Sequence, residues 1–111
     1  MNRAKSSLDW FLGIQKRTTF HDSPISRIVH IADLVFVDAG DKIVKFACCK
    51  AVKVHDFTPD DDWWYDYEAE PIDNSIFRFT VLKEEHVPLL ELRAKTIDVF
   101  DETTYKWYGH S

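Results

Sequence analysis

A chain of 111 residues with 45% hydrophobic and 14% aromatic side chains can build one domain, residues 1–111, around its own core. Three glycines and four prolines are too few for a collagen-like or disordered chain, and no apolar run reaches the roughly 18 residues that cross a bilayer. The N-terminal residues lack the apolar core of a secretory signal, and the adjacent Cys48 and Cys49 form neither a favourable disulfide nor a metal-binding pattern. We therefore expect a soluble, cytoplasmic protein.

Residues 6–15, SSLDWFLGIQ, predict a short N-terminal helix. Ser6 or Ser7 can cap its first turn, and Leu8, Phe11 and Leu12 have the i, i+3, i+4 spacing of one apolar face. Because so short a helix is marginal on its own, we expect it to dock on a larger element.

The middle of the chain is typical of β-strands. Residues 27–37, RIVHIADLVFV, are rich in β-branched and aromatic side chains, and residues 38–41 predict a turn in which Gly40 takes a positive φ. In residues 42–55 the apolar side chains that share one face are Val44, Phe46, Cys48, Val52 and Val54. This alternation predicts a long strand, bent near Lys50 by a bulge. A second alternating strand, residues 75–82, points Phe77, Phe79 and Val81 inward.

The C-terminal part predicts a second helix and a closing hairpin. Pro88 suits the first position of a helix, and residues 89–95, LLELRAK, include good helix formers, so we expect a short helix near 88–95. Residues 96–108 predict a hairpin. The predicted fold is α+β: a small, strongly curved antiparallel β-sheet or barrel of five or six strands, with the two helices.

Residues 60–70, DDDWWYDYEAE, are called here the acidic-aromatic segment, and they hold six carboxylates and four large aromatic side chains. The formal net charge of the chain is −5, so removing these six acids leaves the rest of the chain at +1. The segment lies between the predicted strands 42–55 and 75–82. We therefore expect an excursion from the sheet that forms either the rim of a pocket or a docking surface.

Two interpretations of this segment stay open. It is either a solvated loop, in which Trp63 and Tyr65 pack inward and Trp64 faces water, or a surface that binds a partner. Tryptophan and tyrosine dominate binding hot spots, and surrounding acids select a basic partner. In the second interpretation the contact residues are Asp60, Asp61, Asp62, Trp63, Trp64, Tyr65, Asp66 and Tyr67.

Such a surface predicts a non-catalytic interaction protein with a basic protein as its partner. Basic surfaces are common on nucleases and nucleic-acid-binding proteins, so the prediction is an inhibitor of a nuclease or of a nucleic-acid-binding complex, of the immunity or anti-defence type. Direct docking of the segment on DNA is disfavoured, because six carboxylates repel phosphates.

The sequence holds no motif for catalysis. Its five histidines have neither HExxH nor HxH spacing, and it contains no GxSxG elbow and no glycine-rich phosphate loop. The acidic-aromatic segment also lacks the glycine and the terminal glutamate of an EF-hand loop. We expect no catalytic residue, no metal and no cofactor, although a Ser-His-Asp set that assembles only in space stays open.

Four short pieces suggest a family. They are AGDK at 39–42 leading into IVKF, SIFRFTV at 75–81, VPLLEL at 87–92 and DETTYKWYG at 101–109. Together they resemble, over roughly residues 35–108, the layout of the PUA-like superfamily, particularly its EVE and ASCH domains. Those families are small curved β-barrels that bind nucleic acid or a modified base in an aromatic pocket. The resemblance implies this binding as the alternative function.

The resemblance also implies site residues. The alternative nucleic-acid pocket consists of Lys16, Arg17, Lys45, Trp64, Arg78 and Trp107, with Lys50 in the same basic groove and Trp63 and Tyr65 as further members of an aromatic cage. The opening FLGIQKRTTF, residues 11–20, resembles that of ASCH domains, which makes Lys16 the counterpart of a lysine with a catalytic role. An enzyme of this kind needs a pocket in which Lys16, a threonine and a carboxylate converge.

Overall fold

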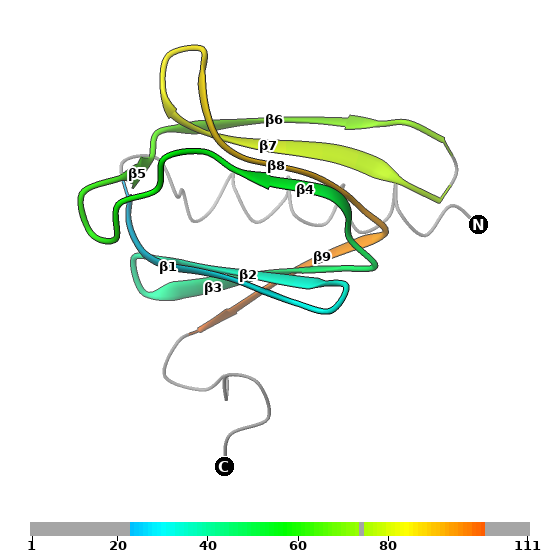
Figure 1. The fold of residues 1–111 in the computed structure, drawn as a ribbon. Coiled ribbons are helices and arrows are strands. Elements are labelled where there is room, and N and C mark those ends of the chain that lie inside the picture. The colour runs from blue at the N-terminus through cyan, green and yellow to red at the C-terminus, as the bar shows by residue number, and fades with distance from the viewer. Residues whose placement is uncertain (1–22, 74, 102–111) are drawn as a thin grey trace.

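The computed structural model describes residues 23–73 and 75–101, which form two antiparallel β-sheets stacked as two layers (Figure 1). The strands are β1 (Ser23–Ile31), β2 (Leu34–Ala39), β3 (Lys42–Ala47), β4 (Lys50–Val54), β5 (Trp63–Trp64), β6 (Asp66–Pro71), β7 (Phe77–Glu84), β8 (Val87–Ala94) and β9 (Thr96–Asp101). The five-stranded sheet has the order β5-β1-β2-β3-β9 and curls into a half-barrel, and the four-stranded sheet has the order β4-β8-β7-β6.

The prediction of an antiparallel, strongly curved sheet is confirmed, but the α+β class is wrong for the described residues, which are all-β. They contain nine strands instead of five or six, and the predicted helix near 88–95 is strand β8. Its register sets Leu90, Leu92 and Ala94 opposite Val81, Phe79 and Phe77 of β7, so core packing overrides the helix propensity of the segment. The helix predicted at residues 6–15 lies outside the described residues.

The predicted strand 42–55 is β3 followed by β4, with a sharp bend between them. Cys48 and Ala51 have φ angles of 58° and 53°, and the pairing of β4 with β8 changes register between Lys50 and Lys53. The bulge predicted near Lys50 is therefore confirmed. The bend also shifts the alternation of side chains, so that Cys49 is buried while Cys48 is exposed. Beyond the bend Val54 is 46% exposed, so the predicted inward face is wrong at both Cys48 and Val54.

This bend carries the chain from one sheet into the other. Strand β3 pairs with β9 in the five-stranded sheet, while its continuation β4 pairs with β8 in the four-stranded sheet. At the matching corner between β8 and β9, the Lys95 amide donates a hydrogen bond of 3.0 Å to the carbonyl oxygen of Ala47. The consecutive strands β3 and β4, and likewise β8 and β9, thus form two bent pairs that connect the two layers along one side of the fold.

The core lies between the two sheets, and aromatic rings make up much of it. Phe79 on β7 is fully buried, and its ring is stacked on that of Tyr67 with 5.3 Å between centroids and an interplanar angle of 4°. Its centroid also lies 5.0 Å from that of Phe46 on β3 and 6.0 Å from that of Trp64 on β5. One ring therefore contacts residues of both sheets.

The five-stranded sheet is apolar on its other face as well. Phe36 and Ile43 are buried although their positions alternate with the core-facing Val37 and Val44. Asp38 lies on the same outer face, where its carboxylate is 3.8 Å from the guanidinium of Arg27. Burial on both faces explains the continuous apolar run in β2, where a one-sided sheet would give strict alternation.

Candidate functional site

The acidic-aromatic segment is built into the sheets, contrary to the expected excursion. Trp63 and Trp64 form β5, which pairs with Ser23 and Pro24 at the edge of the five-stranded sheet. Residues 66–71 form β6, the edge strand of the four-stranded sheet. The alternation of β6 explains this placement, because Tyr67 and Ala69 pack against the core while the acids that alternate with them, Asp66, Glu68 and Glu70, are exposed.

The two tryptophans have opposite environments. Trp64 is 1% exposed and packs edge-on against Phe79, whereas Trp63 is 44% exposed. The expectation that Trp64 faces water while Trp63 packs inward is wrong, because the register of β5 against β1 points Trp64 to the core. Of these two side chains, only Trp63 is available on the surface to contact a partner. Trp64 packs in the core beneath the strand that carries Trp63.

The two tyrosines of the segment are half-buried. The Tyr65 amide donates a hydrogen bond of 2.9 Å to the carbonyl oxygen of Leu82 on β7. Burial raises the pKa of the Tyr67 phenol above its ordinary value of 10.0, and the adjacent Asp66 carboxylate raises it further. The Tyr65 backbone and the Tyr67 ring, which stacks on Phe79, anchor the segment, and Asp66 lies exposed between the two tyrosines.

The loop before β5 is fixed by backbone hydrogen bonds. The Asp60 amide donates to the Ile25 carbonyl oxygen at 2.9 Å, and the Ile25 amide donates to the Asp62 carbonyl oxygen at 2.9 Å. The amides of Asp61 and Asp62 both donate to the Thr58 carbonyl oxygen at 3.1 Å. Asp60 has a φ of 67°, a left-handed conformation that aspartate tolerates better than most residues.

The three consecutive aspartates have different roles. The Asp62 carboxylate accepts a 2.7 Å hydrogen bond from the Thr58 amide and lies 4.0 Å from Lys83 Nζ, which itself donates to the Asp56 carbonyl oxygen at 3.1 Å. The side chains of Asp60 and Asp61 are exposed. The loop therefore uses Asp62 to hold its shape and presents Asp60 and Asp61 to solvent.

We expect Asp62→Ala to lower the free energy of unfolding by about 0.5–1.5 kcal/mol, the usual net value of one hydrogen bond, because the Thr58 amide exchanges the carboxylate for water. Asp61→Ala is the matched control, with an expected change within about 0.5 kcal/mol because its side chain is exposed. Urea unfolding of both variants measures the difference, and equal losses would contradict the structural role of Asp62.

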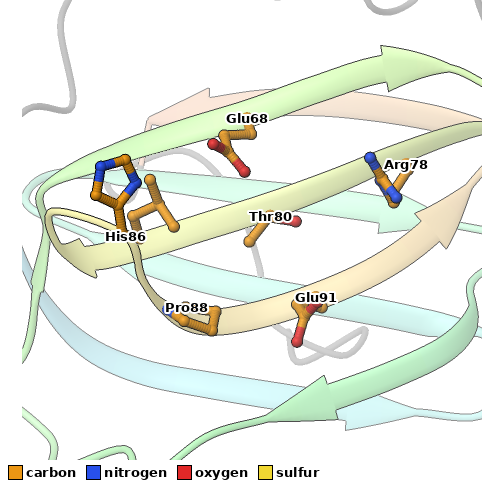
Figure 2. Close-up of a pocket in the computed structure, with 7 residues that line it drawn as sticks. Glu68, Arg78, Thr80, His86, Pro88 and Glu91 are labelled. Carbon is orange, nitrogen blue, oxygen red and sulfur yellow. The ribbon is translucent and has the colours of Figure 1, made fainter.

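The outer face of the four-stranded sheet carries a polar hollow of about 290 Å³ (Figure 2). Its lining comes from β6, β7, β8 and the hairpin between the last two, and consists of Glu68, Arg78, Thr80, Leu82, His86, Pro88 and Glu91. Arg78 forms an ion pair with Glu70 of the edge strand. Within residues 23–73 and 75–101, no three histidine, cysteine or acidic side chains are grouped so that they could hold a metal ion.

Of the alternative nucleic-acid pocket, Lys45, Trp64 and Arg78 do not come together, whereas Lys50 and Arg78 of the predicted basic groove share the outer face of the four-stranded sheet. Lys45 lies on the five-stranded sheet opposite Phe36 and Asp98, on the face turned away from the core. Arg78 lies on the outer face of the other sheet, and the buried Trp64 lies in the core between the two sheets. Lys16, Arg17 and Trp107 are outside the described residues.

Sequence reasoning missed Lys53 and Arg93 as members of a charged surface. The helix that the sequence predicts near 88–95 gives Arg93 no neighbours on other strands, and only the pairing of β8 with β7 and β4 reveals them. An alternating pattern across Leu90, Leu92 and Ala94 is the signal that indicates a strand at this position.

Comparison with known proteins gives no relative: no family model, curated protein or solved structure matches this chain. The resemblance to PUA-like domains thus stays a prediction. Across the part of the chain that the structure describes, no helix is long and apolar enough to span a membrane.

Proposed function

We propose that this protein is a non-catalytic interaction protein that binds a basic protein partner through Trp63, Asp60 and Asp61. The observation that carries the proposal is the exposure of Trp63, the most exposed aromatic side chain among the described residues, directly after a loop that presents two carboxylates. These three residues are called here the docking patch. It refines the surface predicted from sequence, with Trp64 and Asp62 as its support.

The fixed backbone of the loop favours binding. Four amide hydrogen bonds hold Asp60, Asp61 and Asp62 against Thr58 and Ile25, so little chain entropy is lost when a partner docks. A tryptophan side chain buries a large area with few torsions to fix, which is why it recurs in binding hot spots. The docking patch is therefore largely pre-organised.

The charge of the docking patch supports a basic partner. Asp60 and Asp61 are exposed beside Trp63, and the chain as a whole carries −5. Such a field raises the rate of encounter with a positive surface. Nucleases and nucleic-acid-binding complexes have surfaces of this sign, so we propose inhibition of such a protein, in the manner of an immunity or anti-defence protein.

We expect Trp63→Ala to weaken partner binding by about 2 kcal/mol, roughly a 30-fold rise in Kd, while the fold stays intact. Asp61→Asn should slow association and reduce its dependence on salt. The matched control is Ile72→Ala, which truncates a side chain that is 45% exposed at the far end of β6.

The experiment has two stages. A pull-down from the native host, read by mass spectrometry with wild type and Trp63→Ala in parallel, identifies the partner, and calorimetry with the purified partner then gives the Kd values. A partner that binds Trp63→Ala and wild type equally, or a captured ligand that proves to be nucleic acid, would overturn the proposal.

A further inference from the structure

A line of positive side chains crosses the outer face of the four-stranded sheet. The strand registers place Lys50 of β4 opposite Arg93 of β8, and Arg93 opposite Arg78 of β7. Neighbouring strands lie about 4.8 Å apart, so the line spans roughly 10 Å. All three side chains are exposed. They are called here, with Lys53, the cationic row.

The cationic row borders a second hollow on this face. Lys53, Arg78 and Arg93 line a space of about 140 Å³ together with Ala51, Leu92 and Glu91. Like charges directly opposite each other on neighbouring strands are destabilising, and here the repulsion recurs across two strand pairs. A bound anion would offset this repulsion.

The neighbouring acids leave the positive charge around Arg93 and Lys50 uncompensated. Arg78 is paired with Glu70, but Lys50, Lys53 and Arg93 form no ion pair with any residue in the described ranges. Among the described residues that line the hollow, Glu91 is the one carboxylate, and its Oε2 lies 2.6 Å from His55 Nε2 on the β4 side. The Glu91 carboxylate lies opposite Lys53, so it offsets the charge of Lys53. Arg93 has no facing carboxylate, because its partners across the strands, Lys50 and Arg78, are both cationic.

We propose that this hollow binds an oxyanion of the phosphate type through Arg93, Arg78 and Lys53, with Lys50 at its margin. A guanidinium presents planar donors that match phosphate oxygens two at a time, and two such groups lie on adjacent strands here. The site goes beyond the proposed function, because it shares no residue with the docking patch and lies on the other sheet.

Titration of the ¹⁵N-labelled protein with inorganic phosphate, at an ionic strength held constant with sodium chloride, tests the proposal. We expect saturable shifts of the amide signals of β4 and β8, and at least a tenfold rise in Kd for Arg93→Gln. Lys95→Gln removes an exposed lysine from the corner after β8 and should bind as wild type does. A parallel titration with tripolyphosphate distinguishes a ligand with linked phosphates, which binds more tightly, from a single phosphate group.

Thermal unfolding gives a second readout that does not depend on the titration. Arg93→Gln removes a like-charge contact, so its Tm without phosphate should be at or above that of wild type, while phosphate should raise only the Tm of wild type. Shifts that rise linearly without saturation, or equal responses of wild type and Arg93→Gln, would overturn the proposal.

Discussion

Phe79→Ala should lower the free energy of unfolding by about 3–5 kcal/mol. The Phe79 ring is fully buried and contacts Tyr67, Trp64 and Phe46, which belong to both sheets. Truncation leaves a cavity between the layers that the hydrogen-bonded strands can close only in part. Because domains of this size are stable by about 5–15 kcal/mol, the variant should be close to unfolding at physiological temperature.

Urea unfolding followed by tryptophan fluorescence measures this loss, since the buried Trp64 lies against Phe79. The control is Ile72→Ala, whose side chain is largely exposed and whose removal should cost no more than about 0.5 kcal/mol. A loss below about 1 kcal/mol for Phe79→Ala would show that the two sheets do not depend on this ring.

The second large effect concerns the adjacent cysteines. Burial raises the pKa of the Cys49 thiol to about 12, although the hydrogen bond to the Val35 backbone works in the opposite direction. Only the thiolate reacts with alkylating agents, so the native Cys49 should react about a thousandfold more slowly than a thiol of pKa 9.0. Cys48 is exposed and should be alkylated readily.

Two single-cysteine variants separate the sites. Cys49→Ser leaves Cys48 and should be modified by iodoacetamide within the time taken by a free thiol, whereas Cys48→Ser leaves Cys49 and should resist until urea is added. Rapid modification of Cys49 in the folded protein would contradict its burial at the bend.

The same burial makes stability depend on pH. The folded-state pKa of Cys49 is raised, so the unfolded thiol loses its proton first as the pH rises, and the folded state loses stability between about pH 9 and pH 12. The expected slope from this group is about 1.4 kcal/mol per pH unit. Tyr67, whose folded-state pKa is raised above 10.0, contributes in the same direction from about pH 10 upward, so comparison with Cys49→Ala isolates the cysteine. Identical slopes in the two proteins would exclude Cys49 as the cause.

The parts of the fold that the sequence predicts are those with a clear period of two. Phe77, Phe79 and Val81 alternate in β7, and Val44 and Phe46 alternate in β3, all of them in the core. The sequence does not predict strand β8, because two consecutive residues, Leu89 and Leu90, are both buried and break the alternation of buried and exposed side chains. They lie next to changes in the pairing of β8 with β7. The good helix formers of residues 89–95 therefore favour the prediction of a helix over that of a strand.

The candidate site was predictable in composition but not in detail. The many acidic and aromatic side chains in residues 60–70 indicate a candidate binding region. Which of its two tryptophans is exposed depends on the pairing of β5 with β1. The role of Asp62 depends on a hydrogen bond to Thr58, and the cationic row depends on the register of three strands. Each is a tertiary relation that no local pattern specifies.

We expect the bent pairs of strands that join the two layers to form late in folding. Two three-stranded meanders, β1–β2–β3 and β6–β7–β8, pair strands that are neighbours in sequence. The pairings of β3 with β9 and of β4 with β8 join segments from distant parts of the chain. Loop-closure entropy delays such distant pairings, and all-β topologies that depend on them fold in milliseconds to seconds. Until the corners at Cys48 and Lys95 close, each meander exposes an apolar face, which makes that interval the one in which the chain is most prone to aggregate.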